Sequence, residues 1–557
     1  NQENVRRSTF IPSDVYFARM YKSRGNIYSQ RRQTQTLEAM LSFSKYMFNF
    51  VQVDAMAGMG KYLESNEGYG ISYEDTHDMI NEHDISSAKG KIYPTSHTLK
   101  NEKRSQFFKL SFDVLDRYVI SATLRRDGTD KFFPGKKYAL FPSVSAAWKI
   151  SNEKFLKDVF WINLLKLRAS YGKTGQDNLG SSLYGVYEPS GFKVGFNDNG
   201  LFYVPCVSMG TNYPDVSWQK TIMKNIGLDF YLFKNRVSGS IDVFRNDVTS
   251  LLGYASTSPL AIYPTRPING GHFYRQGWEI MLDTKNMVGD FNWNTQLTFS
   301  KTNSFWKERM PNYDYRSYQK RNKEPMNAYY YYKMTGIINA DRSNMPESQK
   351  TLQAEAQLPG CPIIDDKNND GKIDENDIYL KDNTPDIYIG FGNTFTYKNW
   401  EFSFFMYGQF GILKSNIAYR AALPGPLAVD YPENTNKYAY LLWNSQTNPN
   451  GTRPGLAVDR MGALPGGAGV NIDMENASFV RMRNITLSYN FRDKILGKLK
   501  KYVKGIKVYA DVQNPFVISK FKGFDPEIYT GGGGANNASR GEYPQARTFT
   551  LGTNIVF

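Results

Sequence analysis

The chain has 557 residues, a net charge of +15 and only two cysteines, and aromatic residues make up 15 % of it. No stretch of 18 apolar residues occurs, which excludes a membrane-spanning helix but not a β-barrel, whose strands alternate apolar and polar side chains. The Lys and Arg residues are spread along the chain instead of forming a basic stripe. An anionic membrane surface is therefore a better partner for them than nucleic acid.

The dominant pattern is a two-residue alternation of side chains. In YVISATLR, the positions on one face are Tyr118, Ile120, Ala122 and Leu124. The same period recurs in LKLRASYG (165–172), VSGSIDVF (237–244), NWNTQLTFS (292–300) and NITLSYNF (484–491). A period of two over about eight residues indicates strands with one apolar face.

Short turns join these strands into hairpins. We expect turns at Leu115–Asp116, Lys234–Asn235, 288–290 and Lys398–Asn399, because each lies between two alternating segments. The segments TLEAMLSFSKYM and FNFVQVDAMAGMGKYL predict an earlier hairpin. In all, the pattern predicts about fourteen or fifteen strands.

Long segments separate many of the hairpins, namely 172–219, 301–386 and 411–477. Short turns at one end of the strands and long loops at the other are typical of an outer-membrane barrel. Three alternatives stay open at this point: a soluble, calcium-dependent glycan-binding β-protein, a passive porin, and a surface adhesin. A soluble sandwich has the same alternation, but its apolar face packs against a second sheet.

The chain ends in the alternating segment RTFTLGTNIVF. It places Phe549, Leu551, Ile555 and Phe557 on one face. Because a barrel closes its last strand on its first, we expect this segment to be the barrel-closing strand.

The segment DDKNNDGKIDEND contains a twelve-residue pattern typical of a calcium loop. The expected ligands are Asp366, Asn368, Asp370, the backbone carbonyl of Lys372, Asp374 and Asp377, and Gly371 stands where the loop turns sharply. Position 12 is Asp377 instead of the usual Glu, which reaches the ion more easily. The alternative is an acidic turn whose side chains cap their own backbone. A calcium sensor needs a helix on each side, whereas these flanks resemble loop and strand, so we expect a structural Ca²⁺ ion.

The sequence gives only weak indications of catalysis, disulfide formation or substrate binding. The chain has no GxSxG or HExxH motif and no carboxylate pair placed beside a histidine, so we expect no catalytic residues and no enzyme activity. A disulfide between Cys206 and Cys361 is possible but has no support in the sequence, and two free or loop-borne cysteines are the simpler expectation. The tyrosines of 329–332 suit stacking on sugar rings or packing within a strand at the membrane rim, and the rim or packing interpretation is favoured. The sequence assigns no substrate-binding residue.

Several segments, taken in order, resemble the SusC/RagA-type TonB-dependent outer-membrane transporters. The resemblance runs from Phe107 to Phe557 and includes YVISATLRRDGTDKF, LKLRASYGKTGQDNLG, NIGLDFYLFKNRVSGSIDVFRNDVTSLL, PDIYIGFGNTFTYKNWEFSFFMYGQFG and VYADVQNPFVISKFKGFDPEI.

The resemblance implies an all-β, transmembrane antiparallel barrel of about 22 strands with a plug domain in its lumen. Residues 1–557 would be the C-terminal portion of that barrel, and the plug is expected to lie before Asn1. The implied function is active import of bulky nutrients, either glycans or oligopeptides, across the outer membrane of a Gram-negative bacterium. The implied partners are a SusD-like surface lipoprotein lid, the TonB complex acting through the plug, membrane lipid, and a second transporter–lid pair. The short turn at Lys398–Asn399 suggests the periplasmic side for that end of its strand, which would place the calcium loop outside the cell.

Overall fold

The structure is a computed structural model, and it describes residues 2–11, 24–75, 85, 88–179, 187–190, 196–197, 200–201, 206–209, 213–257, 265–313, 315–319, 323–416, 440–455, 464–491, 497, 502–523, 525–527 and 545–557. No helix in these ranges is both long enough and apolar enough to cross a membrane.

Within the described residues, one antiparallel sheet of seventeen strands dominates the fold. Most of its strands pair with the next strand of the sheet along the chain, but β27 (Val517–Ser519) pairs with β25 (Phe479–Phe491) and β28 (Thr548–Val556) pairs with β26 (Gly505–Gln513). The long segments add only short strands of their own. The strands of the sheet are β1 (Gln2–Ile11), β2 (Arg24–Met47), β3 (Val51–Glu74), β4 (Ile92–Val114), β5 (Tyr118–Thr129), β6 (Tyr138–Lys149), β7 (Ile162–Gln176), β12 (Gln219–Leu232), β13 (Val237–Ser256), β14 (Thr265–Met287), β15 (Phe291–Glu308), β20 (Ile387–Tyr397), β21 (Trp400–Phe410), β25 (Phe479–Phe491), β26 (Gly505–Gln513), β27 (Val517–Ser519) and β28 (Thr548–Val556).

The hairpin turns have the backbone that tight turns between twisted strands require. Leu115 and Asp116 have φ of 58° and 52°, and Lys234 and Asn235 have φ of 57° and 60°. Positive φ at both central residues matches the right-handed twist of the flanking strands. The predicted turns are therefore confirmed, including Lys398 with φ of 53° between β20 and β21.

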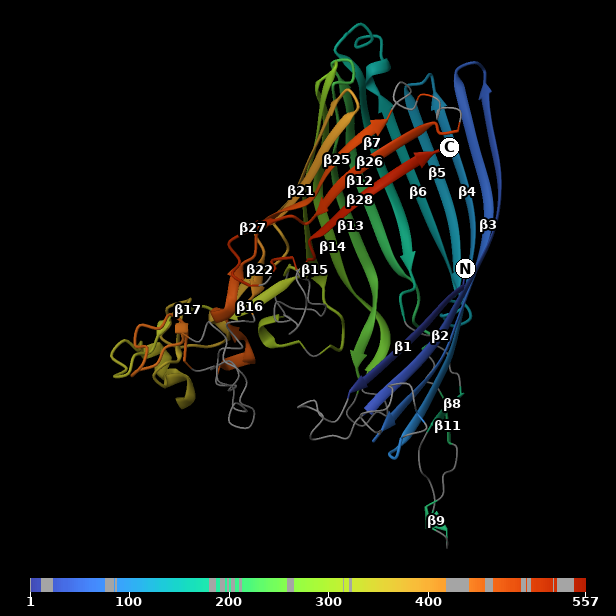
Figure 1. The fold of residues 1–557 in the computed structure, drawn as a ribbon. Coiled ribbons are helices and arrows are strands. Elements are labelled where there is room, and N and C mark those ends of the chain that lie inside the picture. The colour runs from blue at the N-terminus through green and yellow to red at the C-terminus, as the bar shows by residue number, and fades with distance from the viewer. Residues whose placement is uncertain are drawn as a thin grey trace.

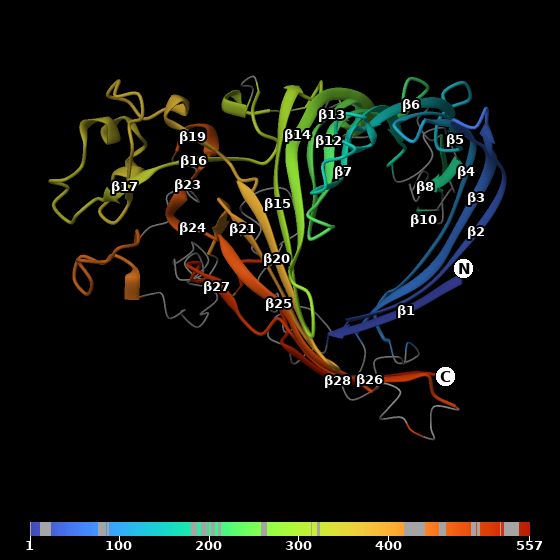
Figure 2. The ribbon, with the colours of Figure 1, turned by 90° about the horizontal axis from the view of Figure 1, so that it is seen from above.

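The short turns lie at one end of the sheet, and the long segments leave from the other end (Figure 1). Strands β2 and β3 have 24 residues each, whereas about nine to eleven tilted residues cross a bilayer. The long strands therefore continue beyond the membrane. Seen from above, the sheet curves round an interior space, with β1 and β28 near its two edges (Figure 2).

The sheet has more strands than the fourteen or fifteen expected. The alternation missed β1, whose sequence QENVRRSTFI is polar on both faces, and β27, which has only three residues. Among the described residues, β1 pairs only with β2, and β28 pairs only with β26. Closure of the last strand on the first, as expected from the sequence, stays a prediction.

The segments at the far end from the turns hold short strands and single turns of 3₁₀ helix. The strands are β8 (Tyr187–Ser190), β9 (Phe196–Asn197), β10 (Gly200–Leu201), β11 (Cys206–Met209), β16 (Ala328–Tyr332), β17 (Met334–Ile337), β18 (Pro362–Ile364), β19 (Tyr379–Asp382), β22 (Leu413–Ser415), β23 (Gly469–Val470) and β24 (Met474–Asn476). The 3₁₀ turns of these segments are η4 (Ser317–Gln319), η5 (Glu347–Thr351), η6 (Ala354–Gln357), η7 (Glu375–Asp377), η10 (Pro465–Gly467) and η11 (Asn471–Asp473). A further 3₁₀ turn, η3 (Ile150–Asn152), lies at the short-turn end, where Asn152 donates to the backbone oxygen of Asp116.

Candidate functional site

The two faces of the sheet differ in chemistry. On the outer face, large apolar side chains point into solvent: Ile120 is 51 % exposed, Ile226 62 % and Val243 59 %. Ile226 pairs with Val243 across β12 and β13, so these side chains form a continuous apolar surface. A soluble protein rarely exposes such a surface, whereas a barrel wall presents it to lipid. The soluble alternative is therefore wrong.

Aromatic side chains gather near the short turns. The rings of Tyr118 and Trp148 stack with centroids 6.5 Å apart, and those of Trp161 and Phe233 stack at 5.8 Å. Because aromatic rings favour the level of the lipid headgroups, this belt marks one edge of the membrane.

The inner face carries a network of charged side chains that spans three strands. Arg168 on β7 donates from Nε to Oδ1 of Asp229 on β12, at 2.9 Å, and from its terminal nitrogen to Oδ2 of Asp242 on β13, at 2.7 Å. Lys166 adds an ion pair to Asp229 at 3.2 Å, and Asn225 donates to Asp242 at 3.1 Å. These groups satisfy one another and leave the inner wall strongly polar.

A glycine on β12 makes possible the contact between Arg168 and Asp242, which reaches across that strand. Gly227 lies in register between Arg168 and Asp242. A Cβ atom at this position would lie 2.6 Å from Cζ of Arg168 and 2.6 Å from Oδ1 of Asp242. The absence of a side chain on β12 therefore lets the guanidinium cross that strand.

A recess of about 480 Å³ lies near the turn end of β13 to β25. Amide and hydroxyl groups line much of it, among them Asn235, Ser238, Gln296, Asn294 and Asn484. Such groups hydrogen-bond neutral polar solutes, and they are typical of a water-filled lumen.

A buried ion cluster ties the segment after β27 to the sheet. Arg481 on β25 is only 3 % exposed, and it pairs with Asp525 at 2.5 Å and with Glu527 at 2.7 Å. The hydroxyl of Tyr407 on β21 also donates to Glu527. Because a buried charge is costly without a partner, Arg481 holds this segment in place.

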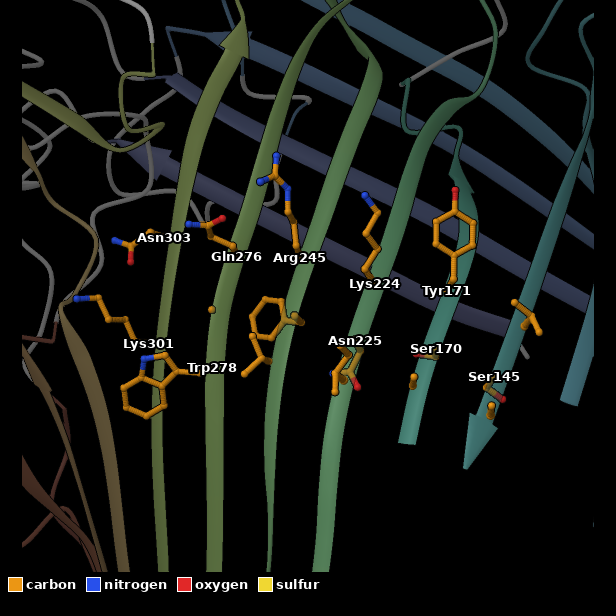
Figure 3. A pocket seen from close by; sticks show the side chains of 17 residues that line it. Ser145, Ser170, Tyr171, Lys224, Asn225, Arg245, Gln276, Trp278, Lys301 and Asn303 are labelled. Atoms are coloured by element: carbon orange, nitrogen blue, oxygen red, sulfur yellow. The ribbon is translucent and has the colours of Figure 1, made fainter. Parts of the chain in front are cut away.

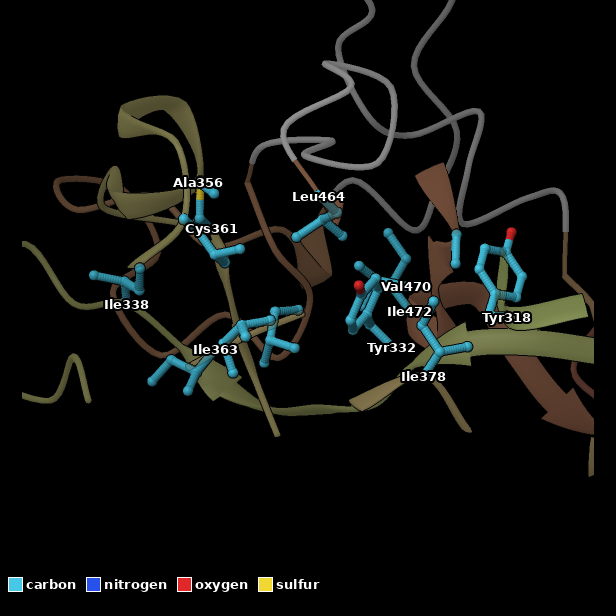
Figure 4. Close-up of a cluster of buried hydrophobic side chains, with 14 residues drawn as sticks. Tyr318, Tyr332, Ile338, Ala356, Cys361, Ile363, Ile378, Leu464, Val470 and Ile472 are labelled. Carbon is cyan, nitrogen blue, oxygen red and sulfur yellow. The ribbon is translucent and has the colours of Figure 1, made fainter. Parts of the chain in front are cut away.

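The long segment 301–386 contributes to a packed module of its own. Its core includes Tyr332, Cys361, Ile378 and, from the segment before β25, Val470 (Figure 4). Tyr332 is fully buried, and its hydroxyl donates to the backbone oxygens of Asp374, at 3.0 Å, and Pro465, at 3.1 Å. Burial raises the pKa of Tyr332 well above its usual value.

The structure places the tyrosines of 329–332 in β16 of this module. The rings of Tyr329 and Tyr331 stack with centroids 5.1 Å apart, and Tyr329 is buried like Tyr332. The packing interpretation is therefore confirmed, although the strand lies in the module and not at a membrane rim. Cys361 is a free, buried thiol, and the side chain of Cys206 lies outside the described residues.

The predicted calcium loop turns where the sequence indicates. Gly371 has φ of +81°, and Asn369, two residues before it, has φ of 57°. The carboxylate of Asp366 accepts hydrogen bonds from the backbone N–H groups of Asp370, at 3.2 Å, and Gly371, at 2.9 Å. The loop is flanked by β18 and β19, and η7 forms its last three residues, so no helix pair brackets it.

The remaining ligand side chains also bond within the loop. Asn368 accepts from Asp370 N at 3.1 Å, and one carboxylate oxygen of Asp370 accepts from Lys372 N at 2.9 Å. The carboxylate of Asp374 accepts from Asn376 N at 2.7 Å.

Asp377 is fully buried, and its two oxygens accept from the N–H groups of Lys367, at 2.9 Å, and Asp374, at 2.8 Å. In the described part of the chain, no three acidic, His or Cys side chains converge as a metal site. This geometry fits the capped acidic turn, and the calcium ion stays a prediction.

The C-terminal strand has its four marked residues on one exposed face. Phe549 is 73 % exposed and Leu551 81 %, and Ile555 and Phe557 are exposed as well. They belong to the apolar outer surface of the sheet.

The sequence patterns did not identify the charged network of the inner wall. The available signal was that Arg168 and Asp242 occupy polar positions in the middle of predicted strands. Their meeting depends on the register of three strands, which alternation alone does not fix.

The comparisons with known proteins agree with this architecture. A family model described as "TonB dependent receptor-like, beta-barrel" matches residues 2–515. The TonB-dependent receptor SusC of Bacteroides thetaiotaomicron is 29 % identical over 498 residues, which cover 85 % of this chain and 45 % of SusC. The TonB-dependent receptor P3 of Formosa agariphila is 26 % identical over 563 residues, which cover 95 % of this chain and 53 % of that receptor.

The chain thus spans about half the length of these curated relatives. The solved structure of the RagAB peptide transporter matches 100 % of this chain and 58 % of that chain, with a TM-score of 0.78 and 19 % identity, which shows a shared fold. Because the family model covers most of the residues and the apolar outer face requires lipid, the chain belongs to the TonB-dependent receptor-like β-barrel family and forms wall of an outer-membrane barrel.

Proposed function

We propose that this chain is the barrel wall of an active importer that carries bulky nutrients across the outer membrane. The observation that carries the proposal is the pair of opposed faces, apolar outside and charged inside, on a sheet that curves round an interior space (Figure 2). The relatives named as TonB-dependent receptors and the RagAB peptide transporter support it.

The proposed partners follow from the same relatives. The TonB complex would supply energy through a plug in the lumen, and a SusD-like lipoprotein would cover the opening. The packed module supports a lid, because it places a folded surface at the end of the sheet where the long segments lie (Figure 1). Two such transporter–lid pairs would associate.

The proposed substrates are glycans or oligopeptides. Both are long chains of neutral hydrogen-bonding groups, and the amide-lined and hydroxyl-lined recess of the inner wall suits such groups. RagAB is a peptide transporter, which describes that protein alone.

Uptake by intact cells tests this function. Cells with and without the gene would receive fluorescent oligosaccharide and oligopeptide pools, each with and without a protonophore. We expect one pool to enter only when the gene is present and the proton gradient is intact, because TonB draws on that gradient. Gene-dependent entry that persists with the protonophore would support a passive porin instead, and equal entry without the gene would refute transport.

We also propose that a structural calcium ion occupies the loop Asp366–Asp377 outside the cell. The ligand spacing and the turn at Gly371 support it. The hydrogen bonds within the loop weigh against it, and chelation separates the two alternatives.

A further inference from the structure

A shallow groove of about 970 Å³ lies on the outer face of the sheet, across β6, β7, β12, β13, β14 and β15. Figure 3 shows its polar and aromatic side chains on neighbouring strands. The floor is apolar and includes Ala146, Ala169, Ile226 and Val243, all on the face that meets lipid. The groove is therefore outside the lumen and plays no part in the proposed import path.

The groove lies where the apolar surface ends. From the turn at Lys234–Asn235, the outer face of β12 runs through Phe230, Leu228 and Ile226 and then changes to Lys224. On β13, the outer face likewise passes from Val243 to Arg245. This change comes about nine residues from the turn, which is the length of strand that crosses the hydrocarbon layer.

The aromatic belt beside the turns marks the opposite edge of that layer. The cations of the groove therefore lie at the level of the lipid headgroups in the leaflet nearer the long segments. Tyr171 and Trp278 accompany them, as aromatic rings do at a membrane interface.

The cations point away from the hydrocarbon. In Figure 3, the side chains of Lys224 and Arg245 extend along their strands in the direction away from the short turns. This orientation is the snorkelling by which long basic side chains reach the headgroups. The side chain of Lys224 is 53 % exposed and that of Arg245 is 43 % exposed, so both ends are accessible.

The charge of the groove is positive. Arg245 pairs with Asp247 at 3.2 Å, and Lys224 lies 3.6 Å from the same carboxylate. Among the residues that the structure describes, Lys301 makes no ion pair, although it lines the same groove. Arg245 and Lys224 thus share one carboxylate, and Lys301 adds a third cation beside the apolar floor.

We propose that this groove binds a phosphate-bearing lipid of the membrane, with its acyl chain on the apolar floor and its phosphate between Lys224, Arg245 and Lys301. An apolar surface beside uncompensated cations complements a lipid that is apolar at one end and anionic at the other. The inference rests on the barrel's place in the membrane and not on what it imports.

Native mass spectrometry of the purified full-length protein in detergent tests this site. The added lipids are phosphatidylglycerol and phosphatidylcholine with identical acyl chains, so only the headgroup charge differs. The variant is K224Q/K301Q, which leaves the Arg245–Asp247 pair intact. The control K109Q/R125Q removes two cations from the inner face of β4 and β5, where Lys109 pairs with Thr123 and Arg125 with Phe107.

We expect the unmodified protein to prefer phosphatidylglycerol. Each lysine near an anionic lipid contributes about fivefold in affinity, so K224Q/K301Q weakens that binding about 25-fold while K109Q/R125Q leaves it unchanged. Equal affinity for the two lipids, or equal loss in both variants, would overturn the proposal. A change in oligomeric state in K224Q/K301Q with unchanged lipid binding would show instead that a second copy occupies the groove.

Folding of each variant is checked by its heat-dependent mobility in SDS gels. If K224Q/K301Q fails to fold, the single variant Lys301→Gln, which removes a cation without an ion pair, takes its place with an expected loss of about fivefold.

Discussion

Arg168 on β7 crosses the full width of β12 to donate to Asp242 on β13 at 2.7 Å, passing over Gly227. The same guanidinium bonds to Asp229, so one side chain joins three strands through two carboxylates. This contact lies on the inner face, where the polar side chains of the wall meet.

A side chain at Gly227 is expected to break this contact. In Gly227→Ala, the new Cβ would lie 2.6 Å from Arg168 and from Asp242, so the guanidinium must shift. We expect a loss of about 1–2 kcal/mol in the free energy of unfolding, measured by denaturant titration of the barrel in detergent. Gly289→Ala is the control, because a Cβ there meets no atom within 4 Å. Equal stability of the two variants would contradict the role given to Gly227.

Much of this wall could be predicted from the sequence. The alternation located the strands on either side of the turn at Leu115–Asp116, because each apolar position is fixed by the two faces of a strand. The network around Arg168 could not be predicted, because it depends on which residues of β7, β12 and β13 stand side by side. Alternation gives the face of a residue but not its neighbour on the next strand.

The Arg481 cluster is expected to hold the segment after β27. In Arg481→Met, Asp525 and Glu527 lose their cation, and Asp525 is itself buried. We expect a destabilisation of about 3 kcal/mol and faster tryptic cleavage after Lys520 and Lys522.

Arg483→Met is the matched control for that variant. Arg483 is exposed, and within the described residues its side chain bonds to Asn514 alone, at 3.2 Å, so its loss should leave cleavage unchanged. Cleavage at the same rate in both variants would argue against a structural role for Arg481.

Cys361 is expected to be inert in the folded protein. Burial raises the pKa of its thiol to about 11, so the reactive thiolate is nearly absent at pH 8. In Cys206→Ser, which leaves Cys361 as the single thiol, we expect maleimide to react at least about a hundredfold faster after unfolding. Rapid reaction of the folded protein would contradict the burial.

The raised pKa of Cys361 also determines how the stability of the folded protein changes with pH. In the unfolded chain, the thiol ionises near its usual pKa of about 8.5, whereas in the folded module it stays neutral up to about 11. The unfolded state is therefore favoured as the pH rises through this window, and below it the thiol has no effect. As the pH rises from about 8.5 to about 11, the thermal stability of Cys361→Ala should fall less than that of Cys206→Ser.

The calcium proposal predicts a dependence on chelator. In Asp366→Ala with Asp370→Ala, we expect segment 301–386 to lose protease resistance while the barrel still assembles. Lys372→Ala is the control, because only its backbone carbonyl is an expected ligand. Protease resistance of the unmodified protein that is the same in calcium and in chelator would show that the hydrogen bonds of the turn suffice.

The packed module is the part of the fold that sequence patterns predict least well. Segment 301–386 has only short apolar runs, such as PII in β18, so alternation predicts a loop. Its core forms because Tyr332 pairs with Val470, which comes from a segment more than a hundred residues away, and no local pattern records that contact.

The most direct test of the central claim, that the face of Ile226 meets lipid and the face of Asn225 meets the lumen, is fluorescence quenching by brominated lipids. A fluorophore would be attached at Ile226→Cys or Asn225→Cys in the full-length protein, with the native cysteines replaced by serine, and the protein placed in bilayers. We expect strong quenching at position 226 and almost none at 225. Quenching of equal strength at the two positions, or the reverse order, would contradict a barrel wall with this orientation.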